Sequence, residues 1–287
     1  MKVCVACEAR FESEGWRCPE CGSSPSFDGF LRFSASETTA ADAFPEGSFA
    51  HLPGQEETSF WFRGRNELIG WALRTYFPNA RSFFELGCGT GVVLAALSAR
   101  RPDVSFAGGE PFAAGLEVAR ARVPEVPLFQ LDGRRLPFDE EFDVVGAFDV
   151  LEHVVEDEAV LAQMFQATKP GGGILVSVPQ HPWLWSAVDE FSRHRRRYTA
   201  GELADKVESA GFRVLRKTSF VSLLLPVLAL SRLRDRRKTA YDPSTEYGLP
   251  DAVDRFFGAA MSAERRLIGA GLSFPVGSSL LLAARRP

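Results

Sequence analysis

The sequence has 287 residues, of which 45% are hydrophobic and 24% charged, and its formal net charge at neutral pH is −4. These values are ordinary for a globular protein, and they argue against a dedicated nucleic-acid binder, which usually carries a basic face. No apolar run reaches the roughly 18–20 residues of a membrane-spanning helix, and the N-terminus lacks the apolar stretch of a signal peptide. We therefore expect a cytoplasmic protein.

Four of the five cysteines lie within the first 21 residues, as Cys4, Cys7, Cys18 and Cys21. Two C-x2-C pairs separated by ten residues are typical of a tetrahedral zinc site, and redox or iron–sulfur chemistry is the alternative. We predict a zinc ribbon over residues 1–26 that the metal holds together, because so few residues cannot build a core. A ribbon that recruits a partner or contacts the substrate is the competing interpretation.

Residues 27–56 are rich in Ser, Ala, Pro and Gly and are predicted to form a linker, followed by a helix over 57–77. From residue 82 onward, apolar strands alternate with helical segments, which indicates a parallel α/β sheet. The expected strands are 82–86, 104–108, 127–130, 143–148, 173–178, 212–218 and a last, antiparallel strand at 278–284.

A glycine-rich loop follows the first of these strands. It combines an acidic residue, three glycines and a small filler between them: Glu85, Gly87, Cys88, Gly89 and Gly91. Such glycines let the backbone approach a ligand, and the helix predicted over 92–99 presents free N–H groups to it. A dinucleotide site needs G-x-G-x-x-G, and Val92 occupies the sixth position, so the loop predicts a different nucleotide ligand.

Polar motifs also follow the later strands. Glu110 ends the second strand, where a carboxylate can accept both hydroxyls of a ribose. Asp132 and Gly133 follow the third strand, Phe148 and Asp149 close the fourth, and a turn at 169–172 precedes the fifth. With these motifs, residues 57–287 resemble the class I S-adenosylmethionine-dependent methyltransferases of the small-molecule type.

The resemblance implies a Rossmann-like, seven-stranded, mostly parallel sheet with helices on both faces, and S-adenosylmethionine as cofactor. In that family the acidic residue before the glycines holds the methionine part, and the position of Asp132 contacts adenine. The implied cofactor-binding residues are Glu85, Gly87, Cys88, Gly89, Gly91, Glu110, Pro111, Asp132, Gly133, Phe148 and Asp149. The family more often has an Asp near Glu110, a departure that leaves the ribose role intact.

The segment from Asp149 to His153 carries candidate catalytic groups. If it is helical, Asp149, Glu152 and His153 share one face. A similar segment binds a divalent metal in small-RNA 2′-O-methyltransferases and ubiquinone-pathway O-methyltransferases, so the resemblance implies a Mg²⁺-type site completed by His181. The alternatives are His153 as general base, with His181 as a second catalytic candidate, or a merely structural role.

An arginine-rich segment precedes the helix that begins after Thr199. Arg195, Arg197 and Tyr198 are predicted to contact an anionic acceptor, because arginine binds phosphate or carboxylate through two hydrogen bonds. The alternative is a solvated basic loop paired with Asp189 and Glu190.

A helical insertion is expected at about residues 220–271. Its apolar stretch, 220–230, is too short to cross a bilayer and is followed by five basic residues: Arg232, Arg234, Arg236, Arg237 and Lys238. Three interpretations remain open: an interfacial anchor that gives peripheral membrane contact, a lid over an apolar acceptor, or a core helix with a charged end.

These features together predict a methyltransferase that uses S-adenosylmethionine and acts on a small or lipid-like, anionic acceptor, with oxygen favoured as the methylated atom. One alternative is an RNA methyltransferase that uses the ribbon and the arginines to bind phosphates, which the acidic net charge disfavours. Another is a non-catalytic module that binds S-adenosylmethionine.

Overall fold

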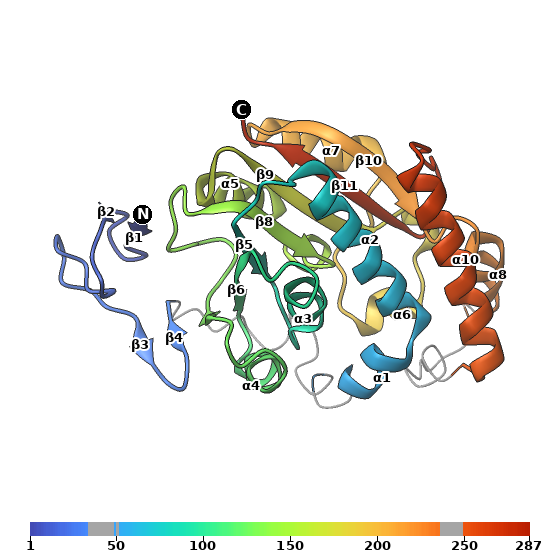
Figure 1. Cartoon of the computed structure of the whole chain (residues 1–287), viewed down its shortest axis with the longest axis horizontal. Coiled ribbons are helices and arrows are strands. Elements are labelled where there is room, and N and C mark those ends of the chain that lie inside the picture. Colours follow the sequence, from blue (N-terminus) through green and yellow to red (C-terminus); the bar gives the residue numbers. More distant parts are fainter. Residues whose placement is uncertain (34–48, 50–51, 236–248) are drawn as a thin grey trace.

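The computed structural model describes residues 1–33, 49, 52–235 and 249–287. Its centre is one mixed sheet covered by helices on both faces (Figure 1). In spatial order the strands are β10 (Arg213–Phe220), β11 (Ser279–Arg285), β9 (Thr168–Pro179), β8 (Phe142–Phe148), β5 (Ser82–Leu86), β6 (Ser105–Glu110), β7 (Leu128–Gln130), β4 (Leu31–Arg32) and β3 (Ser26–Phe27).

The seven strands from β10 to β7 confirm the predicted sheet, with β11 antiparallel to both of its neighbours. The buried strands read as continuous apolar runs, because helices cover both faces of a parallel sheet. At β5 the strand order changes direction, since β6 lies on one side of it and β8 on the other. Ligands of open α/β sheets bind at such a switch point, beyond the carboxyl ends of the strands.

Two short strands extend the sheet within residues where the sequence predicts a linker. β4 pairs in parallel with β7, and β3 pairs antiparallel with β4. Phe30 and Phe33 are buried beside them, and the amide of Phe33 donates to the carbonyl of Gln130 at 2.9 Å. The two aromatic side chains therefore fasten this segment to the sheet edge.

Two apolar cores lie on opposite faces of the sheet. The first is packed against α2 (Phe60–Tyr76), α3 (Val92–Ser98), α4 (Ala113–Arg122) and α10 (Asp251–Gly269). The second is packed against α5 (Asp157–Ala167) and α7 (Ala200–Ser209). The other described elements are β1 (Lys2–Val3), β2 (Arg10–Phe11), α1 (Leu52–Thr58), η2 (Leu151–His153), η3 (Pro182–Leu184), α6 (Ala187–Phe191) and α8 (Leu225–Asp235). No described helix is long and apolar enough to cross a membrane.

Two local predictions need correction. The helix expected over 57–77 is divided at Ser59, whose hydroxyl accepts the amide of Trp61 at 3.2 Å and so starts α2 as a separate helix. The turn expected at 169–172 lies within β9 as an irregularity opposite Asp143, and Gly171 has the positive φ of 79° that lets the strand bulge.

The cysteine ribbon is docked on the edge of the sheet, beside the loop that joins β7 to β8 (Figure 1). The amide of Val3 donates to the carbonyl of Pro137 at 3.0 Å, and the amide of Asp139 donates to the carbonyl of Met1 at 2.9 Å. The Trp16 ring packs edge-on against Phe33 and Phe138, with centroids 4.6 and 5.9 Å away. The ribbon is thus attached to the body of sheet and helices by backbone and aromatic contacts.

Candidate functional site

The glycine loop connects β5 to α3 at the switch point. Gly87, Gly89 and Gly91 all have positive φ, of 69°, 49° and 74°. The amides of Gly87 and Cys88 donate to the carbonyl of Gly109 at 2.7 and 3.1 Å, which fixes the loop against the end of β6. A side chain at Gly87 would meet Val150 at 2.4 Å, so this position requires glycine for its backbone angle and for space.

Glu110 is the best-positioned of the predicted cofactor groups. It lies buried at the end of β6 and accepts the amides of Gly89 at 3.1 Å and Phe112 at 3.2 Å. Burial raises the pKa of Glu110 to about 7, against the opposing effect of the two amides. Two backbone donors therefore orient this carboxylate beside the glycine loop.

Glu85, in β5 just before the glycine loop, has an unsatisfied buried oxygen. Within the described residues, Oε2 of Glu85 has no hydrogen-bond partner. Burial raises the pKa of Glu85 well above its ordinary value, and the positive charge of Arg65 opposes this rise. A buried carboxylate oxygen without a partner is costly unless a ligand supplies a donor, so Glu85 suits a cationic or N–H-bearing ligand group.

Arg65 is a site residue that the sequence analysis missed. Its guanidinium forms an ion pair with Asp149 at 2.5 Å and lies over the Trp61 ring, 4.5 Å from the centroid. A signal was available, because Arg65 falls in helical register with the apolar face of α2, which includes Leu68 and Ile69. An arginine at such a position is buried only if a partner compensates its charge.

The remaining predicted cofactor residues lie around the same edge. Asp132 follows β7 and accepts a hydrogen bond from Arg134, with Nη2 and Oδ2 2.6 Å apart. Burial alone would raise the pKa of Asp132, but the hydrogen bond and charge of Arg134 lower it overall. Pro111 accepts a hydrogen bond from Gln130 at 2.9 Å. A side chain at Gly133 would meet Leu86, and Phe148 is buried at the end of β8.

The segment from Asp149 to His153 differs from the predicted helix. Asp149 has a φ of 58°, and only the single 3₁₀ turn η2 follows. Asp149 therefore turns away to pair with Arg65 and does not share a face with Glu152 and His153. The structure instead brings Glu152 and His153 together with His194, with one ligand atom of each within 4.8 Å of the others.

This triad replaces the predicted quartet, because neither Asp149 nor His181 belongs to it. Nδ1 of His194 lies 2.9 Å from Asp189, which fixes the orientation of the imidazole. Glu152 is fully buried, neither of its oxygens has a partner among the described residues, and burial together with Asp149 raises its pKa well above the ordinary value. These three side chains are candidate metal ligands.

The two predicted catalytic histidines have different surroundings. Burial and the neighbouring His194 lower the pKa of His153 to about 3, and a base so weak removes a hydroxyl proton inefficiently near neutral pH. His181 has a φ of 63°, and its ring stacks on Trp183 with centroids 5.6 Å apart. Beside it, Gln180 is fully buried, and neither its amide nitrogen nor its amide oxygen has a partner in the described residues.

The arginine-rich segment is largely paired within the protein. Arg197 is buried and donates to Asp189 at 2.7 Å, and Arg196 forms an ion pair with Asp157 at 3.1 Å. Tyr198 is fully buried, and its hydroxyl donates to Asp157 at 2.7 Å. Arg195 is the exposed one of the three predicted acceptor contacts. The pairing of Arg197 with Asp189 agrees with the alternative interpretation of this segment, whereas its contacts with Asp157 were not predicted.

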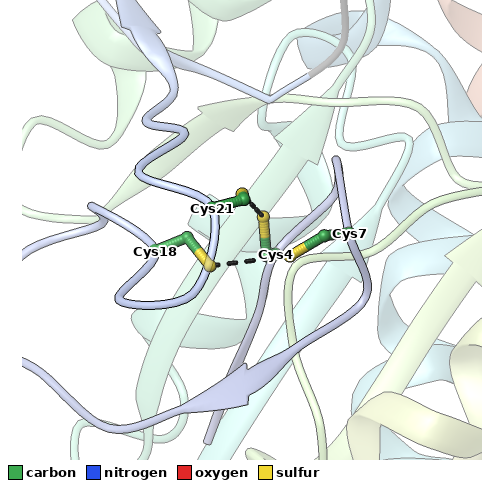
Figure 2. A group of neighbouring side chains, drawn as sticks. All are labelled: Cys4, Cys7, Cys18 and Cys21. Atoms are coloured by element: carbon green, nitrogen blue, oxygen red, sulfur yellow. Dashed lines mark hydrogen bonds between the residues drawn. The ribbon is translucent and has the colours of Figure 1, made fainter.

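The four N-terminal cysteines converge on one point (Figure 2). Their sulfur atoms lie within 4.8 Å of one another, and two pairs, Cys4 with Cys21 and Cys7 with Cys18, are 3.6 Å apart. Four sulfurs at about 2.3 Å from a tetrahedral zinc ion are about 3.8 Å apart. The spacing in this structure therefore fits a Cys₄ zinc site.

Comparison with known proteins agrees with this geometry. The family described as "Methyltransferase domain" matches residues 56–217, which is more than half of the chain. The chain belongs to this methyltransferase family. Its S-adenosylmethionine-dependent members use that compound as methyl donor.

Sequence relatives of this methyltransferase-family chain include proteins of known name. An S-adenosylmethionine-dependent methyltransferase of Mycolicibacterium smegmatis is 34% identical over 170 residues, which cover 57% of this chain and 63% of the relative. The ubiquinone biosynthesis O-methyltransferase of Methylobacterium nodulans is 28% identical over 164 residues, which cover 50% of this chain and 64% of the relative. The chain thus matches less than two thirds of either relative.

Solved structures show the same fold at low sequence identity. A methyltransferase of Thermotoga maritima has a TM-score of 0.52 and 17% identity, covering 84% of this chain and 97% of its own. The [4+2]-cyclase SpnF has a TM-score of 0.51 and 22% identity, covering 78% and 81%. The fold alone is common to both, so the reaction has to be inferred from the site.

Proposed function

We propose that this chain transfers a methyl group from S-adenosylmethionine to a small or lipid-like acceptor, with oxygen as the favoured atom and an anionic group on the acceptor. The observation that carries the proposal is the glycine loop fixed beside Glu110, with the amide of Gly89 on the carboxylate that would accept the ribose hydroxyls. Family membership supports the methyl donor.

The residues of the crevice divide this task. Glu110 would hold the ribose, Glu85 the ammonium of the methionine part, and the loop after β7 with Asp132 the adenine. When bound, the sulfonium supplies an activated methyl group. The protein then has to place the acceptor in line with it and receive a proton if the acceptor carries one.

Unsatisfied buried groups support an acceptor pocket beyond β8 and β9. Gln180 and Glu152 are fully buried, and their side-chain polar atoms lack partners among the described residues. Buried polar atoms are almost always hydrogen-bonded, so such groups indicate a missing ligand or water. Arg195 is the exposed cation from the predicted acceptor set that could meet an anionic group.

Two measurements test the proposal. Calorimetry with S-adenosylhomocysteine measures cofactor binding, for which we expect Glu110→Gln to weaken the affinity roughly 10- to 100-fold. Methyl-labelled S-adenosylmethionine is then incubated with a cell extract and the purified protein, and the extract is separated into nucleic acid, protein, lipid and small-molecule fractions. The proposal requires label in the lipid or small-molecule fraction, which Glu110→Gln abolishes.

The same assay decides between the alternatives. Label in the nucleic-acid fraction, with binding that falls steeply as salt rises, would favour an RNA methyltransferase. Tight binding of S-adenosylhomocysteine without transfer to any fraction would favour a non-catalytic module.

We further propose that Cys4, Cys7, Cys18 and Cys21 bind a structural zinc ion, supported by their sulfur spacing. Elemental analysis of the purified protein should give one zinc per chain, and Cys18→Ser should release it. Cys88 is the matched control, because it is buried in the glycine loop away from the other four, so Cys88→Ser should keep the zinc.

A second metal site is a narrower proposal, supported by the triad of Glu152, His153 and His194 and by the hold of Asp189 on His194. Titration of the whole protein with Mn²⁺, followed by electron paramagnetic resonance, should show one bound ion that Glu152→Gln removes and Cys18→Ser keeps. Equal Mn²⁺ binding by wild type and Glu152→Gln rules the site out.

A further inference from the structure

The insertion between β10 and β11 places α8 and α10 at the end of the molecule opposite the ribbon (Figure 1). The exposed apolar residues along α8 and its entry recur at helical spacing: Leu223, Pro226, Val227 and Leu230. The three larger side chains among them are 46%, 53% and 51% exposed. Isolated exposed leucines are ordinary, but a helix with an outward apolar stripe indicates a surface that is covered by something else.

α10 carries a second outward stripe. Phe256 is 68% exposed and Leu267 is 40% exposed, and the exposed residues between them on this face are Ala259 and Ala263. Two exposed arginines, Arg255 and Arg266, flank the stripe. The outer face of α10 is therefore apolar and bordered by these arginines, with the exposed Asp251 at its start.

The two helices are linked on their inner sides. The buried carboxylate of Glu264 in α10 accepts the amides of Ser222 and Leu223, at the entry to α8, at 2.8 and 2.9 Å. On their inner sides, Leu228 of α8 and Phe257 of α10 pack against the same apolar core. The two helices are therefore joined at the entry to α8 and cover the same apolar core.

Charge identifies the kind of partner. The exposed Arg255 and Arg266 border the stripe of α10, whereas the whole chain has a net charge of −4. A second copy docked on this surface would bring arginines against arginines, which opposes self-association. An apolar stripe bordered by arginine instead complements a layer of anionic lipid headgroups over acyl chains.

We propose that the surface of α8 and α10 binds an anionic lipid membrane, with Leu223, Val227, Leu230 and Phe256 inserted below the headgroups. The insertion follows the carboxyl end of β10, which is the edge that carries the glycine loop. Asp254 of α10 also accepts the amide of Phe60, at the start of α2, at 2.6 Å. Membrane binding would thus bring the crevice close to lipid; that the acceptor comes from the membrane rests on the proposed function.

The test is flotation of the full-length protein with vesicles of phosphatidylcholine alone and of phosphatidylcholine mixed with phosphatidylglycerol. We expect wild type to bind the anionic vesicles at least about tenfold more tightly. Val227→Glu with Leu230→Glu should abolish flotation, and Arg255→Gln with Arg266→Gln should weaken it about 25-fold, at roughly fivefold per arginine. Phe27→Glu is the matched control at the opposite end, since Phe27 is 74% exposed, and it should float like wild type.

The result does not depend on enzymatic activity, because flotation needs neither methyl donor nor acceptor. Binding of S-adenosylhomocysteine confirms that each variant is folded. The proposal is overturned if wild type does not float with anionic vesicles, or if Val227→Glu with Leu230→Glu floats like wild type. It is also overturned if ultracentrifugation shows that wild type is a dimer, that Val227→Glu with Leu230→Glu is a monomer, and that neither protein binds vesicles. The surface would then join two copies.

Discussion

The two halves of the crevice differ in how their polar groups are satisfied. On the cofactor side, backbone amides hold the glycine loop on Gly109 and orient Glu110. Oε2 of Glu85 is the exception on this side, because it lacks a partner among the described residues. On the acceptor side, Glu152 and Gln180 are fully buried and lack side-chain partners among the described residues.

The difference shows which half is preformed. A site built on backbone geometry is complete before its ligand arrives and can be recognised from glycine spacing alone. A site built on unsatisfied side chains stores a desolvation cost that a ligand, metal or water relieves on binding. Changes on the cofactor side should therefore weaken binding, whereas apolar changes on the acceptor side should stabilise the free protein.

The largest expected effect comes from Gly87→Ala, at the point where the two halves meet. The new Cβ would clash with Val150, and the alanine would have to adopt the φ of 69° that Gly87 has. We expect the affinity for S-adenosylhomocysteine, measured by calorimetry, to fall about 100-fold, since the left-handed angle alone costs about 1–2 kcal/mol.

A double variant separates the two causes. Adding Val150→Ala should recover the part due to the clash and leave the part due to the backbone angle. Gly201→Ala is the control, because nothing lies within 4 Å of the new Cβ, and helix propensity predicts a gain of up to about 1 kcal/mol in stability. Wild-type affinity in Gly87→Ala would show that the loop is not the cofactor site.

Much of the fold was predictable because its determinants are local. Buried strands are continuous apolar runs, and the prediction of β5 at 82–86 agrees with the structure, as does the antiparallel last strand. The hairpin of β3 and β4 was not predicted, because strands of two residues leave no periodic pattern and are fixed by long-range pairing with β7.

The acceptor side was less predictable because its contacts are remote in sequence. Arg65 and Asp149 are 84 residues apart, and their pairing depends on a positive φ at Asp149 that its sequence did not indicate. His194 comes from a segment remote from Glu152 and His153, and Asp189, five residues before it, orients its ring. The basic residues of the insertion at 236–238 lie outside the described residues.

The acceptor side is tested next by Gln180→Met. The change removes buried amide atoms that lack partners, so we expect a gain of about 1–2 kcal/mol in unfolding free energy and a Tm higher by about 2–4 °C. Cofactor affinity should stay within about twofold of wild type, while methyl transfer falls. Gln166→Met is the matched control and should destabilise, because Nε2 of Gln166 donates to the carbonyl of Phe138 at 3.1 Å.

The pH dependence of cofactor binding follows from Glu110. Its pKa of about 7 means that much of the free protein carries a neutral Glu110 below neutral pH. Ribose hydroxyls that donate to the carboxylate favour its charged form, so affinity should rise about tenfold from pH 6 to pH 8 and then level off. Glu110→Gln should flatten the profile. Glu85 is present both in wild type and in Glu110→Gln. If the affinity of the two proteins changed equally with pH, the pH dependence would belong to a group other than Glu110.

The smallest expected effect comes from Trp16→Ala, which tests whether the ribbon supports only the cofactor side. Trp16 packs on Phe33, Phe129 and Phe138, and so braces the loop after β7 that carries Asp132. Each such aromatic contact contributes about 0.5–1.5 kcal/mol to stability, and Trp16→Ala loses these contacts. We expect part of the loss to weaken the affinity for S-adenosylhomocysteine about threefold. Trp16→Phe should recover most of it, and Mn²⁺ binding at Glu152 should not change. Weaker Mn²⁺ binding with unchanged cofactor affinity would show that the ribbon acts on the other half.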